Sequence, residues 1–232
     1  MIERYSIHAP ATQLTERFQI AEPLGYNPRY NAAPTQLLPV ITHESPEGFS
    51  FFYWGSAPQW AKNKTLAERI INTHAELIQD KPVFKKKLMR SRCIIPADGF
   101  YAWKKVGKKT SIPWRFVLKS KKIASFAGLW EEYDDAEGQA YHTFTIITVL
   151  ANDTVSPVTE RMPVIFSRKE EELWLNKDTK AETLLDLLKP SPANELEGFT
   201  VSNGINSPTS ESPLLIVPTP ATDQFGNLTL FD

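Results

Sequence analysis

Four short stretches of the sequence combine residue types that can bind or react with other molecules. An aromatic-rich stretch interleaved with lysines can stack on unpaired bases while its cations meet phosphates. Taken singly, each stretch also fits a plain turn followed by a core aromatic residue. Only the four together, in this order, point to a function. In chain order they are PRYNAAPTQ (28–36), INTHAE (71–76), PADGFYAWKK (96–105) and TERMPVIF (159–166).

Motifs for other chemistries do not occur in the sequence. It has no GxxxxGK[ST] or GxGxxG phosphate loop. It also has no HExxH and no Cys or His pair at metal-ligand spacing, so we expect no metal and no cofactor. The four histidines are scattered, and one of them, His142, lies in a strand-like run. Cys93 lies in the apolar run RCIIP and is expected to be a buried small hydrophobe rather than a nucleophile.

The composition is that of an ordinary globular protein. The chain has 232 residues, of which 41% are hydrophobic and 23% charged, enough to bury a sizeable core. One cysteine excludes an internal disulfide and fits a reducing compartment. No stretch approaches the ~20 apolar residues that span a bilayer, and the start lacks a signal-peptide pattern. We therefore expect a cytoplasmic location, which is compatible with association with the nucleoid.

Charge is balanced overall, at a formal net charge of -1, but it is unevenly distributed. Local basic blocks permit a nucleic-acid-binding face. Scattered, solvated lysines explain the same pattern more simply. The basic blocks are KKKLMRSR (85–92) and KKVGKK (104–109), and the acidic ones are EEYDDAE (131–137) and KEEE (169–172).

The elements that must position these residues are mostly strands. β-branched and aromatic runs with alternation predict strands at 35–42, 49–54, 92–97, 113–119, 123–130, 142–149 and 162–166. Helices are expected at 12–18, at 167–176 and 179–189 with capping boxes (Ser167 with Glu170, Thr179 with Glu182), and at 65–77, whose middle also reads as a strand. The fold class is α+β, with a curved or barrel-like, mainly antiparallel sheet and short helices around it.

Together and in this order, the four stretches resemble the SOS-response-associated peptidase (SRAP) family, whose members process abasic sites in single-stranded DNA. The resemblance covers about positions 1 to 216 and implies one SRAP-like domain, with 217–232 as a C-terminal tail. PADGFYAW and RMPV are its most specific parts. The matching segments are MIERY, YNAAP, WGSAPQW, INTHAE, CIIPADGFYAW, TERMP and TVSNGINSPTSESPLL.

The resemblance implies a reaction at the second residue. In this family the initiator Met is removed, which leaves a cysteine first. Its amine condenses with the aldehyde of an open abasic site to a Schiff base, and its thiol then closes a five-membered thiazolidine. A nearby Glu and His assist the proton transfers, while an Asn and several Arg hold the DNA.

This sequence departs from the family pattern at the reactive positions. Ile2 stands at the cysteine, Ala102 at the glutamate and Thr159 at the histidine. Ile and Ala cannot exchange a proton, and a Thr hydroxyl is a poor general base near neutral pH. Ile2 is also too bulky for ordinary methionine removal, so Met1 is expected to stay. Cys93 matches a structural cysteine of the family and does not replace the missing thiol.

More of the family's residues are retained at the DNA-binding positions than at the reactive positions. Asn72 matches the asparagine of the INAR segment, which belongs with the reactive positions. The arginine of that segment is His74 here, which is neutral much of the time near neutral pH, so one phosphate contact is weakened. The positions that match DNA-binding residues of the family are Arg4, Asn31, Pro34, Trp60, His74, Trp103, Thr148 and Arg161.

Several functions fit this pattern of losses. The leading hypothesis is a pseudoenzyme that binds single-stranded or junction DNA without forming the crosslink. An alternative keeps partial activity: the Met1 amine forms a Schiff base and promotes strand cleavage by β-elimination as an abasic-site lyase. The three substitutions are chemically unlike one another, which favours drift after loss of selection over engineering.

The C-terminal tail suggests a third function, a protein-interaction module. NLTLF (Asn227–Phe231) resembles the bacterial sliding-clamp-binding pentapeptide, with Asn227 in place of the usual Gln. Two leucines and a phenylalanine at a flexible terminus can fill a hydrophobic groove of a clamp. A tail that packs on its own domain or stays disordered explains the segment more simply.

Overall fold

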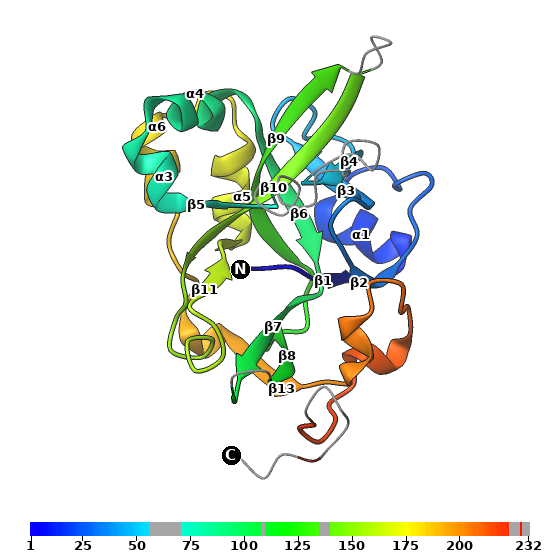
Figure 1. Ribbon diagram of the computed structural model, residues 1–232. Helices are drawn as coiled ribbons and strands as arrows, with labels where there is room; N and C mark the ends of the chain where they lie inside the picture. The colour runs from blue at the N-terminus through cyan, green and yellow to red at the C-terminus, as the bar shows by residue number, and fades with distance from the viewer. Residues whose placement is uncertain (56–70, 108–109, 135–139, 223–227, 229–232) are drawn as a thin grey trace.

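A computed structural model describes residues 1–55, 71–107, 110–134, 140–222 and 228 of the chain (Figure 1). It has two β-sheets, one above the other in Figure 1, with short helices at the periphery. The main apolar core draws on both sheets, because it includes residues of β-strands in each. Within the described part of the chain, no helix is long and apolar enough to cross a bilayer.

The larger sheet has eight strands and closes on itself. Its members are β3 (Leu37–Thr42), β4 (Ser50–Trp54), β5 (Asn72–His74), β6 (Arg92–Ala97), β9 (Ala124–Asp134), β10 (Ala140–Leu150), β11 (Arg161–Pro163) and β12 (Ile165–Phe166). The order is β11-β10-β4-β3-β6-β9-β12, and β9 also pairs with β10, so five strands form a closed ring. Closure leaves those strands without free edges. Most pairs are antiparallel, but β4 and β5 run parallel to β10.

The smaller sheet is antiparallel and has the order β13-β8-β7-β1-β2. Its strands are β1 (Tyr5–Ile7), β2 (Arg29–Ala32), β7 (Gly99–Lys105), β8 (Ser111–Leu118) and β13 (Leu196–Thr200). The chain passes from one sheet to the other at a bend at Asp98, between β6 and β7. Gly99 is required there, because a Cβ at this position would lie 2.6 Å from the carbonyl oxygen of Phe116.

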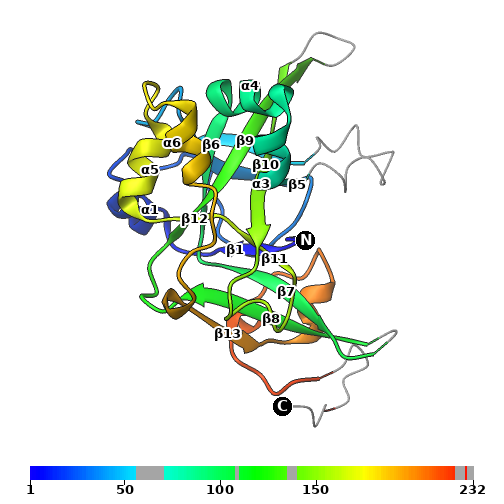
Figure 2. The same ribbon diagram turned by 90° about the vertical axis from the view of Figure 1, so that its left-hand side faces the viewer.

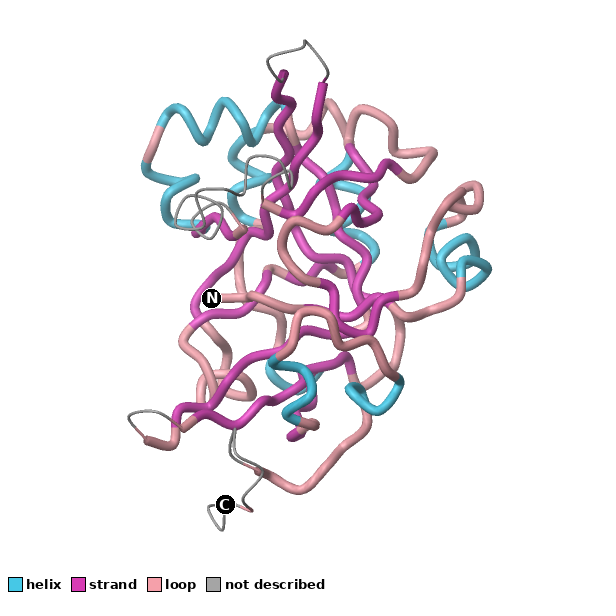
Figure 3. The backbone as a smooth tube through the Cα atoms, turned by 45° about the vertical axis from the view of Figure 1, so that its right-hand side comes forward, coloured by secondary structure: helices cyan, strands magenta, loops and turns pink. Residues whose placement is uncertain are grey.

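Short helices surround the strands (Figure 3). The α-helices of the described chain are α1 (Ala11–Phe18), α3 (Ala75–Asp80), α4 (Pro82–Arg90), α5 (Arg168–Leu175) and α6 (Ala181–Asp186). Three 3-10 turns, η2 (Ala193–Glu195), η3 (Asn203–Asn206) and η4 (Pro213–Ile216), follow α6. After η4 the chain returns along β13, where the Thr219 N–H donates to the Thr200 carbonyl oxygen at 3.0 Å.

The fold class predicted from the sequence is confirmed, and so is each predicted strand in outline. One strand was predicted too simply. The run 162–166 is split into β11 and β12, because it changes partner from β10 to β9 on either side of Val164. Strands β2, β7 and β13 were not predicted as strands. A strand directly after Arg4 was expected and is β1, and the strand alternative for the middle of 65–77 is met in part by β5; each has only three residues.

The helix predictions were right for α1 and α5 and partly wrong elsewhere. At 179–189 the helix is shorter and begins after Lys180, with no side-chain cap. The Thr179 hydroxyl instead donates to the Leu173 carbonyl oxygen at 2.7 Å, so the predicted capping box is wrong. Of the stretch 65–77, residues 65–70 lie outside the described residues, and the rest divides between β5 and α3. Helix α4 was read only as a basic block.

The capping box of α5 gives a direct stability prediction. The Ser167 hydroxyl accepts from the Glu170 N–H, and the Glu170 carboxylate accepts from the Ser167 N–H at 2.9 Å. Ser167→Ala is expected to lower the free energy of unfolding by about 1 kcal/mol, because one N–H at the helix start loses its partner. Urea denaturation measures the change, and Ser120→Ala in an exposed turn is the control. An unchanged midpoint would contradict the role of the cap.

Candidate functional site

The N-terminal segment lies against the barrel beside β5 and β11 (Figures 1 and 2). Met1 is 57% exposed, whereas Ile2 is completely buried. The Asn72 side-chain amide donates to the Ile2 carbonyl oxygen at 2.7 Å and so ties the terminus to the start of β5. The chain therefore leaves Met1 exposed at the surface and holds the next residue in the core.

Strand β10 organises the residues around this terminus. Its Thr148 lies opposite His74 of β5 on one side and Pro163 of β11 on the other. Arg161, the first residue of β11, pairs with Leu150 two positions further along β10. Sheet register alone thus brings His74, Thr148 and Arg161 together from segments far apart in the sequence.

Arg161 is held by three hydrogen bonds. Its Nε donates to the Thr148 hydroxyl at 3.1 Å, and its Nη2 donates to the Thr148 carbonyl oxygen at 2.7 Å. Nη2 also donates to Glu76 Oε2 at 2.8 Å, forming an ion pair. Glu76 is much more exposed than Arg161, with side-chain exposures of 49% and 14%. Among the described residues, Arg161 Nη1 has no hydrogen-bond partner, which leaves it for an external acceptor.

Partial burial and neighbouring charges favour the neutral form of His74. The partial burial of its ring lowers its pKa, and the positive charges of Arg161 and the chain terminus lower it further, against the opposing effect of Glu76. Partial burial raises the pKa of Glu76, but the hydrogen bond from Arg161 and that cation's charge outweigh it, so its pKa is lowered overall. Near neutral pH the cluster therefore holds a neutral imidazole and an ionised carboxylate. His74 gains charge only in more acidic solution.

Two polar atoms near the terminus lack partners. Asn72 Oδ1 and Arg4 Nε are buried and make no hydrogen bond within the described chain. Arg4 Nη1 donates to the neighbouring Glu3 carbonyl oxygen at 2.8 Å, and burial lowers the pKa of Arg4. Unpartnered buried polar groups cost free energy and are uncommon unless a ligand or water satisfies them.

The positions that match the reactive cysteine and glutamate lie close together and are apolar. The pairing of Tyr5 with Phe100 continues in a hydrogen bond of 3.1 Å from the Tyr101 N–H to the Arg4 carbonyl oxygen. This antiparallel register brings Ala102 beside the first residues of the chain. Ala102 is 2% exposed, and both Ile2 and Ala102 belong to the main apolar core.

Thr159, the third such position, lies just before β11 in the turn at 152–159. Its N–H donates to the Val155 carbonyl oxygen at 3.1 Å. In the described chain no hydrogen bond joins Thr159 to Ile2 or Ala102. Two of the three substituted positions thus share the apolar core at this end of the β1–β7 pair, and the third lies on the strand connection that leads to Arg161.

Asn31 and Trp103 lie against a different loop, at 203–210. The Asn31 side chain is buried, and its amide nitrogen donates to the carbonyl oxygens of Ser207 at 2.8 Å and Ser210 at 3.2 Å. The Trp103 indole donates to Asn206 Oδ1 at 2.7 Å. Both residues therefore hold this loop, and a direct contact of either with DNA stays a prediction.

Pro34 lies in the tight turn between β2 and β3. The next residue, Thr35, has φ of 70°. This left-handed conformation is costly for a β-branched residue. A hydrogen bond of 2.9 Å from the Thr35 N–H to the Trp54 carbonyl oxygen helps to hold it. The turn is thus fixed by its surroundings, and contact between Pro34 and a base stays a prediction.

Some predicted residues lie outside the described part of the chain. Trp60 is one of them, and so is all of NLTLF except Leu228. Contact of Trp60 with DNA and docking of the tail on a sliding clamp therefore stay predictions. Among the described residues, no group of three or more His, Cys, Asp or Glu side chains is placed to hold a metal ion.

Glu76 is a site residue that the sequence-based list of binding positions omitted. The signal was present, because Glu76 follows Asn72 and His74 in the INTHAE stretch. What could not be read from the sequence is its partner, Arg161, 85 positions later. The ion pair only becomes evident once β5 and β11 are placed on either side of β10.

Known proteins resemble this chain over most of its length. The family model described as SOS response associated peptidase (SRAP) matches residues 1–208. Abasic site processing protein YoqW of Bacillus subtilis (strain 168) is 41% identical, over 93% of this chain and 99% of its own. Abasic site processing protein YoaM of the same organism is 39% identical over 93% and 97%.

A solved structure supports the fold independently. The X-ray structure of a protein from Bacteroides thetaiotaomicron matches with a TM-score of 0.80 and 27% identity, over 93% of this chain and 99% of that one. The family model covers most of the chain, and close relatives span nearly all of it. The chain therefore belongs to the SOS response associated peptidase (SRAP) family.

Proposed function

We propose that this chain binds single-stranded or abasic DNA at the N-terminal site without forming the thiazolidine crosslink. The observation that carries the proposal is the burial of Ile2 and Ala102, which are 0% and 2% exposed at the family's cysteine and glutamate positions. Neither side chain can act as a nucleophile or transfer a proton. Several of its relatives are named abasic site processing proteins, which supports DNA as the ligand.

The groups that remain at the site suit a phosphate. Arg161 is positioned by Thr148 with one guanidinium nitrogen unused in the described chain, and the exposed Met1 carries the terminal ammonium. Charge-assisted bonds from a fixed guanidinium to phosphate are among the stronger hydrogen bonds. The neutral His74 adds a hydrogen-bonding group without adding charge. Binding thus rests chiefly on Arg161.

Arg161→Ala is expected to weaken binding of single-stranded DNA by about tenfold and to reduce the salt slope by about one. The cause is the loss of one phosphate contact. Fluorescence anisotropy with a labelled oligonucleotide, intact or abasic, measures both values over a salt series. Equal affinity and equal slope for the variant would rule out this site as the DNA contact.

A matched variant separates charge from structure. Glu76→Gln removes the carboxylate that occupies Arg161 and keeps the shape of the side chain. Because the phosphate then no longer competes with Glu76, we expect tighter DNA binding, by about two- to fivefold. Weaker binding by this variant would show that Glu76 positions Arg161 for DNA rather than competing with it.

A second candidate function is residual abasic-site lyase activity of the Met1 amine. It is favoured by the 57% exposure of Met1 and by the nearby His74, whose lowered pKa leaves a neutral imidazole that can accept the proton of the terminal ammonium and free the amine. The amine attacks the aldehyde carbon, water leaves, and the Schiff base then allows β-elimination of the 3′ phosphate.

Borohydride trapping tests this activity. If the amine reacts, a reduced covalent product forms with abasic DNA, and acetylation of the N-terminus abolishes it. The DNA-binding proposal predicts no covalent band in denaturing gels without reductant. A stable band in good yield without borohydride would overturn that proposal, while a trapped band alone would establish the lyase.

A further inference from the structure

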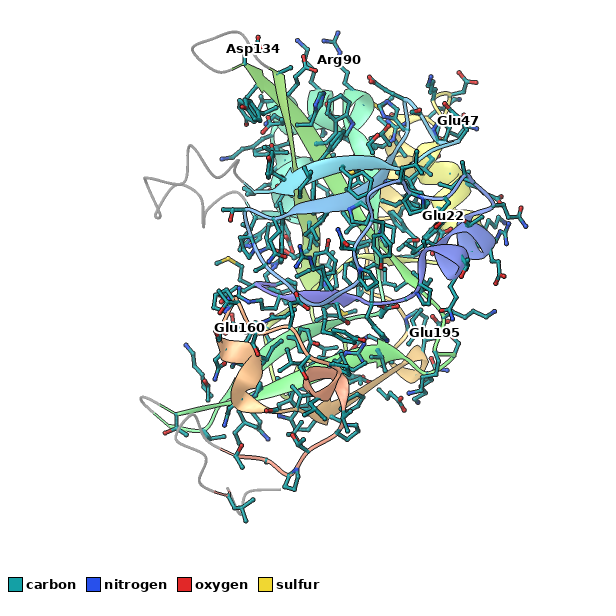
Figure 4. All side chains as sticks on the ribbon, turned by 90° about the vertical axis from the view of Figure 1, so that its right-hand side faces the viewer. Glu22, Glu47, Arg90, Asp134, Glu160 and Glu195 are labelled. Atoms are coloured by element: carbon teal, nitrogen blue, oxygen red, sulfur yellow. The ribbon has the colours of Figure 1, made fainter. Side chains whose placement is uncertain are left out.

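A groove of about 1050 Å³ lies away from the N-terminal site. It is formed by α1, the turn from β8 to β9, the start of α5 and the segment 187–195. Figure 4 shows Glu195, on the rim of the groove, at the opposite edge of the molecule from Glu160, the neighbour of Arg161. The groove is thus distinct from the DNA site proposed above.

Basic side chains dominate one wall of the groove. The turn LKSKKI places Lys119, Lys121 and Lys122 on it, with Lys121 held at φ of 56°. Lys121 forms an ion pair with Glu197, outside the groove lining. Within the described chain, no carboxylate pairs with Lys119, Lys122 or the lining residue Arg168. Exposed cations without partners on one concave surface favour an anionic ligand.

The rest of the lining includes apolar side chains. Ile123, Ile165, Phe166 and Leu187 line the groove and are only 5% to 8% exposed. Arg17, another lining residue, is fixed by Glu171, with 3.1 Å between Nη1 and Oε2, and donates through Nε to the Ile123 carbonyl oxygen at 3.0 Å. Apolar surface of this kind can receive a flat aromatic ring.

Acceptors complete the lining. Glu16 and Glu195 form no ion pair with any described cation. Both carboxylates belong to exposed residues. A ligand with hydroxyl groups as well as negative charge would donate to these two carboxylates.

We propose that this groove binds a nucleoside phosphate. The base lies on the apolar residues, the phosphates meet Lys119, Lys122 and Arg168, and the sugar hydroxyls donate to the free carboxylates. An acidic peptide fits less well, because its carboxylates would meet Glu16 and Glu195 without a compensating donor. Inorganic phosphate alone would leave the apolar surface unused.

Isothermal titration calorimetry of the full chain with adenosine diphosphate, pyrophosphate and adenosine tests the proposal. We expect the diphosphate to bind, and pyrophosphate and adenosine each to bind at least about tenfold more weakly. Lys119→Glu and Lys122→Glu are each expected to weaken binding of adenosine diphosphate by about tenfold. Lys86→Glu, an exposed lysine on α4, is the charge-matched control, and Arg161→Ala tests independence from the DNA site.

The outcomes are distinct. No heat with adenosine diphosphate overturns the proposal, and so does pyrophosphate binding as tightly as the diphosphate, which would leave an unspecific anion site. Equal losses in Lys86→Glu and Lys122→Glu would also overturn it. Loss of binding in Arg161→Ala would place the nucleotide at the DNA site instead. Failure here leaves the DNA-binding proposal untouched, because that rests on other residues.

Discussion

Ile2→Cys, combined with Ala102→Glu and Thr159→His, is expected to convert the chain into one that crosslinks to abasic DNA. The triple change restores the thiol, the carboxylate and the imidazole at the family positions. A small second residue also allows removal of Met1, which places an amine and a thiol on the same residue. The yield is expected to rise from undetectable to a major fraction of the DNA, because formation of the thiazolidine requires both groups.

Two of the three substitutions lie in the core and therefore cost stability. Ile2 is fully buried, so Ile2→Cys leaves space in the core and costs about 1–2 kcal/mol of stability. A carboxylate at position 102, where Ala is 2% exposed, is costly unless it is hydrogen-bonded. Ile2→Cys alone is therefore the first variant to examine, with the other two changes added to raise its rate.

The matched control is Ile2→Ser with the same two companion changes. It also frees the N-terminal amine but lacks a thiol, so it should give only a product that borohydride traps. Denaturing gels measure the crosslink, and intact mass measures removal of Met1. If a folded triple variant with an N-terminal cysteine forms no crosslink, the loss of function lies beyond these three positions.

The sequence predicted the parts of the fold that depend on local pattern. The long strands β9 and β10 carry their own alternation and β-branched residues, and α5 carries its own capping box. Strands β1 and β5 have three residues each and exist because of their neighbours across the sheet. The capping box predicted at Thr179 does not form, because the Thr179 hydroxyl donates to the Leu173 carbonyl oxygen instead.

The site was predicted less completely than the fold. The family pattern named Arg161, Thr148 and Asn72, and the structure joins them around the N-terminus. The sequence could not show that the Asn31 amide donates to the loop at 203–210, because that contact joins residues more than 170 positions apart. Burial of Ile2 beside Ala102 likewise depends on the pairing of β1 with β7.

Arg92→Met is expected to destabilise the protein by about 3–5 kcal/mol, the largest effect of any single change considered. The sequence placed Arg92 both at the end of a basic block and at the start of the predicted strand 92–97, and the structure buries it completely. Its guanidinium lies between the ends of two helices and has no carboxylate partner among the described ion pairs. Burial lowers the pKa of Arg92 to about 10, so it stays charged near neutral pH.

The charge is balanced by backbone carbonyl groups. Nη1 donates to the carbonyl oxygens of Leu88 at 2.8 Å and Met89 at 3.1 Å, at the end of α4. Nε donates to the Trp174 carbonyl oxygen at 2.6 Å and Nη2 to the Asn176 carbonyl oxygen at 3.0 Å, at the end of α5. Carbonyl groups at a helix C-terminus lack partners within the helix and carry the negative end of its dipole, so they suit a cation.

Two effects compete in Arg92→Met. Removing a buried charge relieves its desolvation cost, and apolar replacements of complete buried ion pairs are often neutral or even stabilising. Here the acceptors cannot be removed with the cation, since they belong to the backbone. Four carbonyl groups would lose a donor, two in buried and two in part-buried hydrogen bonds, at a cost of about 1–3 kcal/mol for each that finds no water. The loss of donors therefore outweighs the relief of desolvation.

Urea denaturation followed by tryptophan fluorescence measures the change in the free energy of unfolding. Arg90→Met, at an exposed position at the end of the same helix, is the matched control and is expected to change it by no more than about 0.5 kcal/mol. The loss of stability in Arg92→Lys should lie between those of Arg92→Met and Arg90→Met, since one ammonium cannot reach acceptors on both helices. If Arg92→Met is as stable as the control, water reaches those carbonyl groups, and Arg92 does not hold α4 and α5 to the barrel.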